Sequence, residues 1–256
     1  MEARDTFDTV ADLYGEIRKG YPAALFDDLS ALAGLTPAAR VLEVGCGAGQ
    51  ATGDLAARAG HVTALDPGPA LIDQARSRVP AANADFVVSG FEGFEAAPAS
   101  FDLVASAQAW HWIAPEVAFA KAADLLKPGG TLAVFGHVPF SPPEPLLGAF
   151  RQIYDRFMPG VWGTPPPQAG YLPDGPFAAG FDVSGRFGPV THRGYAWTWE
   201  MDGPTFGKYM RTDSSYRGLP EAVRFGLFDA LQAAIEATGR PCPMPWETHL
   251  YFARRA

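Results

Sequence analysis

The 256-residue chain has two cysteines, Cys46 and Cys242, and it has no lysine between Lys19 and Lys121. Two cysteines that lie far apart in the sequence argue against a disulfide framework and against a zinc knuckle. The lysine-free interval contains a dense glycine turn that follows Val44. A phosphate-binding P-loop needs a lysine directly after its last glycine, so this turn is not a P-loop.

Positive charge is scarce and scattered. The formal net charge is −8, and the richest basic groups are "RKG" at Arg18 and "ARR" near the C-terminal end. A polyanion would need a denser basic patch, so we expect no nucleic acid as substrate or partner. No apolar run approaches the roughly 20 residues of a membrane helix, and the first residues lack the apolar core of a signal peptide. We expect a soluble cytoplasmic protein that binds no membrane, and its oligomeric state stays open.

The first half of the chain alternates between the hydrophobic period of a strand and that of a helix. Strands are predicted over 40–44, 61–66, 84–90, 100–107 and 131–136, and helices over 50–59, 69–79 and 115–126. A strand and helix that alternate in this way predict an α/β fold with a parallel, doubly wound sheet.

The alternation stops after the fifth predicted strand, where proline, glycine and aromatic residues become frequent. The segment 138–193 is therefore predicted as an insertion that caps the site, and 181–199 as a pair of strands. We expect the whole chain to form one domain. In it, 1–35 are lid helices, 36–137 the cofactor-binding core, and 194–256 the C-terminal helices and last strands.

The glycine turn itself, Glu43-x-Gly45-x-Gly47-x-Gly49, follows a predicted buried strand. A dinucleotide fingerprint needs a third glycine or alanine where this chain has glutamine or threonine, so the turn does not match it. Glycines at alternating positions let the backbone approach a ligand closely. A carboxylate suits an ammonium group and helix amides suit a carboxylate, which favours a nucleoside that carries an amino acid. Asp66, at the end of the next strand, is placed to accept hydrogen bonds from ribose hydroxyls.

Five segments together resemble a known family, the class I S-adenosylmethionine-dependent methyltransferases. The likeness is to the small-molecule "type 11" group that includes trans-aconitate methyltransferase-like enzymes. The segments are "YGEIRKGYPAALFDDL" (14–29), "VLEVGCGAGQAT" (41–52), "VTALDPG" (62–68), "SFDLVASAQAWHWI" (100–113) and "LLKPGGTLAVFG" (125–136). The resemblance implies a Rossmann-like, seven-stranded, mostly parallel sheet with flanking helices and a helical, aromatic cap insertion.

The same resemblance implies that S-adenosyl-L-methionine is the cofactor and S-adenosyl-L-homocysteine the product. Gly45, Gly47 and Gly49 would contact its methionine and ribose parts with support from Glu43, and Asp66 would bind the ribose diol. The full set of predicted cofactor residues is Tyr14, Arg18, Glu43, Gly45, Gly47, Gly49, Asp66, Pro67, Phe91, Glu92, Gln108 and Trp110. Many relatives carry an aspartate at the position of Gly90, so adenine would be held here by backbone contacts and apolar packing.

Candidate residues for the methyl acceptor are fewer. His111 follows a predicted strand at the ligand-binding edge and is a candidate general base, although a structural histidine is an equal alternative. Arg18 could pair with the methionine carboxylate or with an acidic acceptor, and otherwise it is a solvated arginine. The predicted acceptor residues are His137, Arg151, Tyr154 and Trp162. No histidine has the spacing of a metal ligand, so we predict no metal.

The predicted function is methyl transfer to a small, fairly apolar molecule by in-line displacement, with O-methylation of a hydroxyl or carboxylate favoured. The aromatic residues of the cap insertion, Phe140, Phe150, Tyr154, Phe157, Trp162 and Tyr171, favour an acceptor of that kind. One alternative is a catalytically silent protein that binds S-adenosylmethionine as a regulatory or partner subunit. Another is a nicotinamide oxidoreductase, which the missing third glycine disfavours.

Overall fold

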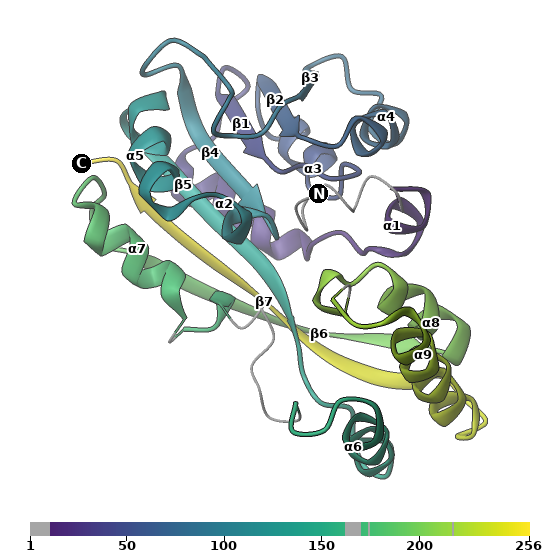
Figure 1. Cartoon of the computed structure of the whole chain (residues 1–256). Coiled ribbons are helices and arrows are strands. Elements are labelled where there is room, and N and C mark those ends of the chain that lie inside the picture. Colours follow the sequence, from purple (N-terminus) through teal and green to yellow (C-terminus); the bar gives the residue numbers. More distant parts are fainter. Residues whose placement is uncertain (1–10, 162–169, 174, 217) are drawn as a thin grey trace.

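The computed structural model describes residues 11–161, 170–173, 175–216 and 218–256, and a seven-stranded sheet lies at its centre (Figure 1). The strand order is β3-β2-β1-β4-β5-β7-β6. The strands are β1 (Arg40–Val44), β2 (His61–Asp66), β3 (Ala84–Val88), β4 (Phe101–Ala107), β5 (Leu126–Pro139), β6 (Thr191–Met201) and β7 (Cys242–Arg254). The first five strands are parallel, and β7 runs antiparallel to both β5 and β6. This confirms the predicted fold class.

Helices cover both faces of the sheet. They are α1 (Ala11–Ile17), α2 (Ala23–Ala33), α3 (Thr52–Ala56), α4 (Pro69–Arg78), α5 (Pro115–Leu125), α6 (Leu146–Phe157), α7 (Pro176–Ser184), α8 (Gly203–Arg211) and α9 (Glu221–Glu236). Buried residues of α2, α3 and α4 pack on one face of the sheet. Those of α5 and α7 pack on the other face. Because β1 lies between two helical layers, its last four residues are all buried, as expected for a parallel strand with both faces covered.

Two predicted boundaries need correction. Residues 181–199 are not a pair of strands, because α7 continues to Ser184 and β6 is the single long strand that follows. Phe177 and Phe181 lie one helical turn apart and both belong to the core beneath α5, which fixes this segment as a helix. The helix α7 therefore covers the sheet and does not cap the site, although it lies within the predicted insertion 138–193.

The predicted lid over 1–35 also divides into two parts. Leu25, Phe26 and Leu29 of α2 are buried against the sheet, so α2 belongs to the sheet's helical layer. The preceding helix α1 contacts α4 and α8 at the edge of the sheet where the parallel strands end. In the described part of 1–35, it is therefore α1 and the residues directly after it that border the site.

A second helical group lies at one end of the molecule. The helices α6, α8 and α9 share an apolar cluster with the ends of β6 and β7. In Figure 1, β5, β6 and β7 all run past the ends of β1 and β4, with β6 and β7 leading toward α8 and α9 and β5 toward α6. Their pairing shows the same extension, since Ala107 at the end of β4 lies opposite Phe135, whereas β5 continues to Pro139 opposite Trp246. The three long strands thus carry side chains beyond the edge at which β1 and β4 end.

In the part of the chain that the structure describes, helices long and apolar enough to cross a membrane are absent.

Candidate active site

The glycine turn after β1 leaves the sheet in backbone conformations that favour glycine. Gly45, Gly47 and Gly49 have φ values of +72°, +55° and +84°. A Cβ on Gly45 would lie 2.2 Å from the Cβ of Ala109, in the turn that follows β4. Any side chain at Gly45 would therefore separate the two turns that form the floor of the site.

Gly49 has a different environment from the one predicted. A Cβ there would lie 3.2 Å from a Val79 methyl group and 3.3 Å from the Cα of Ala75, just past and within α4. This glycine is required for close packing of the turn against α4, and its contact with a cofactor stays a prediction. Gly47 does border the site, where the ring of Tyr14 lies 3.6 Å from the position of a Cβ.

Asp66 at the end of β2 fixes the shape of the glycine turn. Its Oδ2 accepts a hydrogen bond from the amide of Gly47 at 2.9 Å, and its Oδ1 accepts one from the amide of Gly68 at 2.9 Å. Each carboxylate oxygen has two lone pairs, so each can accept a further hydrogen bond from a ligand hydroxyl. The side chain is 7 % exposed and borders the cleft described next.

A first cleft of about 930 Å³, counted out to its mouth, lies over the carboxyl ends of β1, β2 and β4. The predicted cofactor residues that line it are Tyr14, Arg18, Gly45, Gly47, Asp66, Pro67, Phe91, Glu92 and Gln108. Val44, Leu71 and Ile113 add apolar wall. The lining of the cleft thus combines carboxylates, a cation and aromatic rings.

Glu43 is buried beneath the turn, fully out of contact with solvent. Neither of its carboxylate oxygens has a hydrogen-bond partner among the described residues. Burial raises the pKa of Glu43 to about 7, which the Thr52 hydroxyl opposes and the Asp66 carboxylate increases. Glu43 does not line the first cleft, so its predicted support of the cofactor would act through the turn.

Arg18, just after α1, connects two distant parts of the chain at the cleft. Its Nε donates to the Thr212 hydroxyl at 3.0 Å and its Nη2 donates to the Thr212 carbonyl at 2.9 Å. The guanidinium also lies 4.5 Å from the ring centre of Tyr209 and 5.3 Å from that of Tyr14. The alternative of a solvated arginine is wrong, because Arg18 holds the loop after α8 against the site.

Gln108 joins the ends of β4 and β5. Its φ of +58° is strained for a residue other than glycine. The side-chain Oε1 accepts from the amide of His137 at 2.6 Å and Nε2 donates to the carbonyl of the same residue at 3.4 Å. The strained turn is therefore held in place by two bonds to the neighbouring strand.

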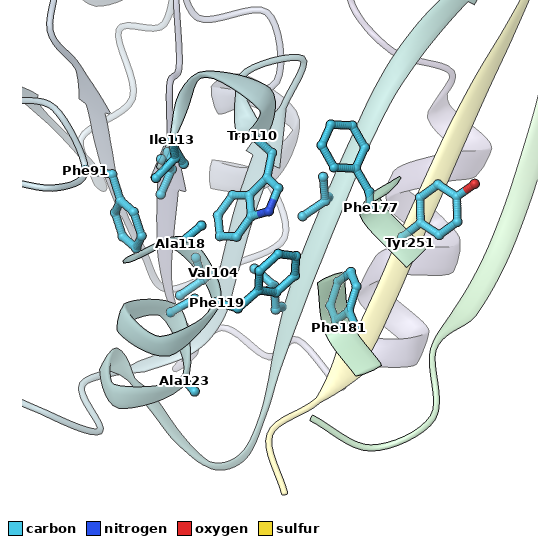
Figure 2. Packing of buried hydrophobic residues seen from close by; sticks show 14 of the residues in the cluster. Phe91, Val104, Trp110, Ile113, Ala118, Phe119, Ala123, Phe177, Phe181 and Tyr251 are labelled. Atoms are coloured by element: carbon cyan, nitrogen blue, oxygen red, sulfur yellow. The ribbon is translucent and has the colours of Figure 1, made fainter. Parts of the chain in front are cut away.

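Trp110, a predicted cofactor residue, lies in the core and lines neither of the two clefts. Its side chain is 2 % exposed and packs between Phe91 and Phe119, with ring centres 6.0 and 5.4 Å away (Figure 2). The short 3₁₀ helix Trp110–Trp112 turns Trp110 into the core beneath α5, while His111 and Trp112 face the cleft. The hydrophobic periodicity of the sequence does not indicate which of these three neighbours is buried and which face the cleft.

His111 lines the first cleft as predicted. Its Nδ1 lies 3.4 Å from the hydroxyl of Tyr171, a buried residue of the segment that precedes α7. Burial lowers the pKa of His111 to about 4, so the imidazole is neutral at pH 7. A neutral imidazole can accept a proton from an acceptor, although so low a pKa makes it a weak base.

A second cleft opens from the first, and we call it the aromatic chamber. The two share Tyr14, Arg18, Gly45, Gly47, Ala107 and Gln108. Its aromatic walls are formed by Tyr21, His137, Trp197, Trp199, Tyr209 and Trp246. The chamber therefore begins at the glycine turn and extends to the long ends of β5, β6 and β7.

His137, a predicted acceptor residue, lies inside the aromatic chamber. Its ring stacks on Tyr21 at 4.3 Å and an angle of 20°, and its Nδ1 lies 2.8 Å from the Thr248 hydroxyl. Burial lowers its pKa to about 3, an effect that backbone carbonyls of Gly20 and Lys19 partly oppose. His137 is thus a neutral wall of the chamber.

Of the other predicted acceptor residues, the described Arg151 and Tyr154 line neither cleft. Arg151 is exposed on α6, and the hydroxyl of Tyr154 lies 2.7 Å from that of Tyr216 in the helical group. Trp162 lies outside the described residues. Of the remaining cap aromatics, Tyr171 belongs to the core beneath α5, where its ring packs against Gly136.

Several residues at the site were missed by the sequence prediction. Asp213 and Ser214 of the loop after α8 line the first cleft, and three tryptophans line the chamber. The sequence did carry a signal for two of the tryptophans, because Tyr195, Trp197 and Trp199 alternate at the two-residue period of one strand face. That pattern identifies an aromatic strand face but does not say that the strand extends beyond the sheet edge.

Comparison with known proteins finds similarity to methyltransferases. The family model described as "Methyltransferase domain" matches residues 42–134. An uncharacterized methyltransferase of Mycobacterium tuberculosis is 35% identical over 129 residues, which are 50% of this chain and 51% of that protein. A ubiquinone biosynthesis O-methyltransferase of Xanthomonas campestris pv. campestris is 40% identical over 100 residues, 38% of this chain and 42% of that protein. The chain thus spans about half the length of the curated relatives it matches.

Solved structures extend the likeness to the whole fold. A structure from Anaeromyxobacter dehalogenans that bears the name of a type II methyltransferase is 27% identical with a TM-score of 0.61. It covers 93% of this chain and 97% of its own. A phosphoethanolamine N-methyltransferase of Haemonchus contortus, solved with phosphomonomethylethanolamine and S-adenosylhomocysteine, has a TM-score of 0.58 at 16% identity. It covers 100% of this chain and 60% of its own. At that identity the second likeness shows the fold alone.

Proposed function

We propose that this chain is a class I S-adenosylmethionine-dependent methyltransferase and that it transfers the methyl group of S-adenosyl-L-methionine to a small molecule. We further propose that the acceptor is fairly apolar and is methylated on a hydroxyl or carboxylate oxygen. The observation that carries the proposal is the junction of two clefts at Gly45, Gly47 and Gln108. One cleft has the groups that suit the cofactor, and the other is walled by aromatic rings.

The residues of the first cleft fit the cofactor chemically. Asp66 and Glu92 offer carboxylate oxygens for ribose hydroxyls, and Arg18 offers a cation for the methionine carboxylate. Val44, Leu71 and other apolar residues of the same cleft suit the adenine ring. The likeness to trans-aconitate methyltransferase-like enzymes in particular stays a prediction, as does a cytoplasmic location.

S-adenosylmethionine supplies a methyl group that its positive sulfur has already activated. In the proposed transfer, a lone pair of the acceptor oxygen forms the new bond to carbon. The bond from carbon to sulfur breaks, and its electron pair stays on the sulfur of the product. This chain contributes alignment, proximity and exclusion of water, with Gln108 and the glycine turn at the junction where the two reactants would meet.

Proton transfer depends on the acceptor. A carboxylate is ionised at neutral pH and needs no base, so its methylation uses only binding and alignment. A phenol or alcohol must lose its proton, and His111 is the titratable side chain of the first cleft that we propose as its acceptor. We propose a small molecule and not a nucleic acid as the partner, because the chain has an excess of negative charge.

The test is labelled-methyl transfer screened over small acids, phenols and amines, with mass analysis of the products. We expect a product heavier by one methylene unit from an acid or a phenol, together with S-adenosylhomocysteine in equal amount. A panel in which only amines are methylated would overturn O-methylation. Tight binding of the cofactor without turnover of any acceptor would instead favour the silent, regulatory alternative.

A further inference from the structure

We propose that the aromatic chamber binds the methyl acceptor, and that this acceptor is a planar aromatic compound with an anionic substituent. This inference rests on the proposed function, since it places the acceptor beside the cofactor cleft. It differs from the sequence-based expectation in most of the residues involved, since His137 is the one described residue of the predicted acceptor set that lines the chamber. Three observations carry it: the position of the chamber, the shape of its walls and its charge.

The position of the chamber suits an acceptor. The chamber shares the glycine turn and the Gln108 turn with the first cleft, so a ligand in each would meet at these residues. Displacement at carbon requires the acceptor atom, methyl carbon and sulfur to lie in line. A ligand in the chamber would reach the junction along residues that do not include the carboxylates Asp66 and Glu92, which line the first cleft alone.

The walls of the chamber are aromatic rings, and two of these rings are nearly parallel. Trp197 lies directly opposite Trp246 in the antiparallel pairing of β6 and β7, and their rings stack with centres 5.5 Å apart at 21°. Trp199 and Trp246 are 8 % and 7 % exposed, whereas Trp197 is only half-buried. The half-buried face of Trp197 is therefore the stacking surface that a planar ligand can reach.

The Trp197 ring is held in one orientation. Its Nε1 donates to the Thr248 hydroxyl at 3.0 Å, and the same hydroxyl lies 2.8 Å from Nδ1 of His137. An indole can only donate, so the oxygen of Thr248 accepts from Trp197 and its own hydrogen is available to His137. One hydroxyl therefore holds two walls of the chamber. A rigid pair of walls selects for a flat ligand.

The charge of the chamber is positive. Arg18 and Lys19 line it, and no carboxylate occurs among the described residues that do so. Nζ of Lys19 lies 5.1 Å from the ring centre of Trp199, which places the ammonium group beside the aromatic wall. Arg18 donates hydrogen bonds to the uncharged Thr212 and also lies near the Asp213 carboxylate, which lines the first cleft. Since Arg18 is the cation proposed for the methionine carboxylate, Lys19 is the cation that an anionic group of the acceptor can approach in the chamber.

The experiment measures binding of three matched probes by calorimetry, with the full chain saturated with S-adenosylhomocysteine. The probes are benzoate (planar and anionic), benzamide (planar and neutral) and cyclohexanecarboxylate (anionic without an aromatic ring). We expect benzoate to bind at least about fivefold more tightly than either of the others. Equal affinity for benzoate and cyclohexanecarboxylate would refute the stacking surface, and equal affinity for benzoate and benzamide would refute the anion site.

Two substitutions assign the effects to residues. Trp197→Ala should weaken benzoate binding about tenfold, and Trp197→Phe should largely restore it. The matched control is Phe225→Ala, which removes an exposed ring of α9 and should leave benzoate binding unchanged. Lys19→Gln should remove the preference for benzoate over benzamide, while Lys208→Gln, whose Nζ pairs with Glu16, should retain it. Benzoate affinity that is indifferent to both Trp197→Ala and Lys19→Gln would overturn the assignment of the chamber.

The experiment distinguishes failure of the chamber's proposed role from failure of the proposed function. If S-adenosylhomocysteine itself does not bind, the proposed function fails. If it binds equally to wild type and to both chamber variants while benzoate binding does not depend on Trp197 or Lys19, only the chamber's role fails. Should Trp197→Ala not fold, the Trp197→Phe and Lys19→Gln variants still decide the result.

Discussion

The buried carboxyl of Glu43 makes the stability of this fold depend on pH in a way that one substitution can isolate. Glu43 has no exposure to solvent, and no hydrogen bond to its carboxylate oxygens occurs among the described residues. Burial raises its pKa from 4.5 to about 7. A carboxyl whose pKa is higher in the folded state binds protons more tightly there, so its contribution to stability is present below pH 4.5. That contribution is lost as the pH rises through 7.

The size of the effect follows from the two pKa values. Between pH 5 and pH 8.5 the folded protein should lose about 2–3 kcal/mol of unfolding free energy through this one group. Glu43→Gln replaces the carboxyl with a neutral group of the same shape. We therefore expect the stability of the variant relative to wild type to rise by that amount over the same pH range, because all other titrations cancel in the difference.

The assay is urea unfolding followed by tryptophan fluorescence at pH 5, 7 and 8.5, in wild type and in Glu43→Gln. The exposed Glu95 supplies the control, since Glu95→Gln should change stability equally at each pH. A stability difference for Glu43→Gln that does not change with pH would refute the reasoning. It would mean that water or a rearranged Thr52 solvates the carboxylate in the folded protein.

Two further predictions concern the first cleft. His111→Ala should lower the turnover of a phenolic acceptor by about 100-fold or more and leave that of a carboxylate acceptor within about twofold. Burial lowers the pKa of His111 to about 4, so kcat/KM for the carboxylate acceptor should not change between pH 5.5 and 8 through titration of His111. Equal losses on both acceptors would remove His111 from proton transfer. Asp66→Ala should weaken binding of S-adenosylmethionine at least about tenfold by calorimetry, since hydrogen bonds to a charged acceptor contribute about 1.5–3 kcal/mol each. Unchanged affinity would contradict the ribose assignment.

The cofactor half of the site could be predicted because its geometry follows from local rules. The ends of parallel strands meet at one edge of a sheet, so the glycine turn after β1, Asp66 after β2 and Gln108 after β4 come together once the strands are recognised. Trp110 shows the limit of this reasoning. Three consecutive residues in a tight 3₁₀ turn point in different directions, and which of them enters the core depends on α5 packing beneath it.

The acceptor half depends on contacts between segments far apart in the sequence. Trp197 faces Trp246 only because β6 pairs with β7 in a given register, and Arg18 reaches Thr212 only after α1 and α8 pack together. A high density of aromatic residues in the insertion suggested the wrong rings, since Tyr171 packs in the core instead of the chamber. Composition predicted an aromatic acceptor site, which stays a prediction, and the register of the long strands determines which rings line the chamber.

The most direct test of methyl transfer measures the label of methyl-tritiated S-adenosylmethionine in products of wild type and of Asp66→Ala, at one cofactor concentration near the wild-type dissociation constant. We predict acceptor-dependent transfer by wild type and at least about a fivefold slower transfer by the variant, because fewer of its molecules hold the cofactor. Label that stays on the cofactor with every acid and phenol offered, or that moves equally fast in both proteins, would contradict the account.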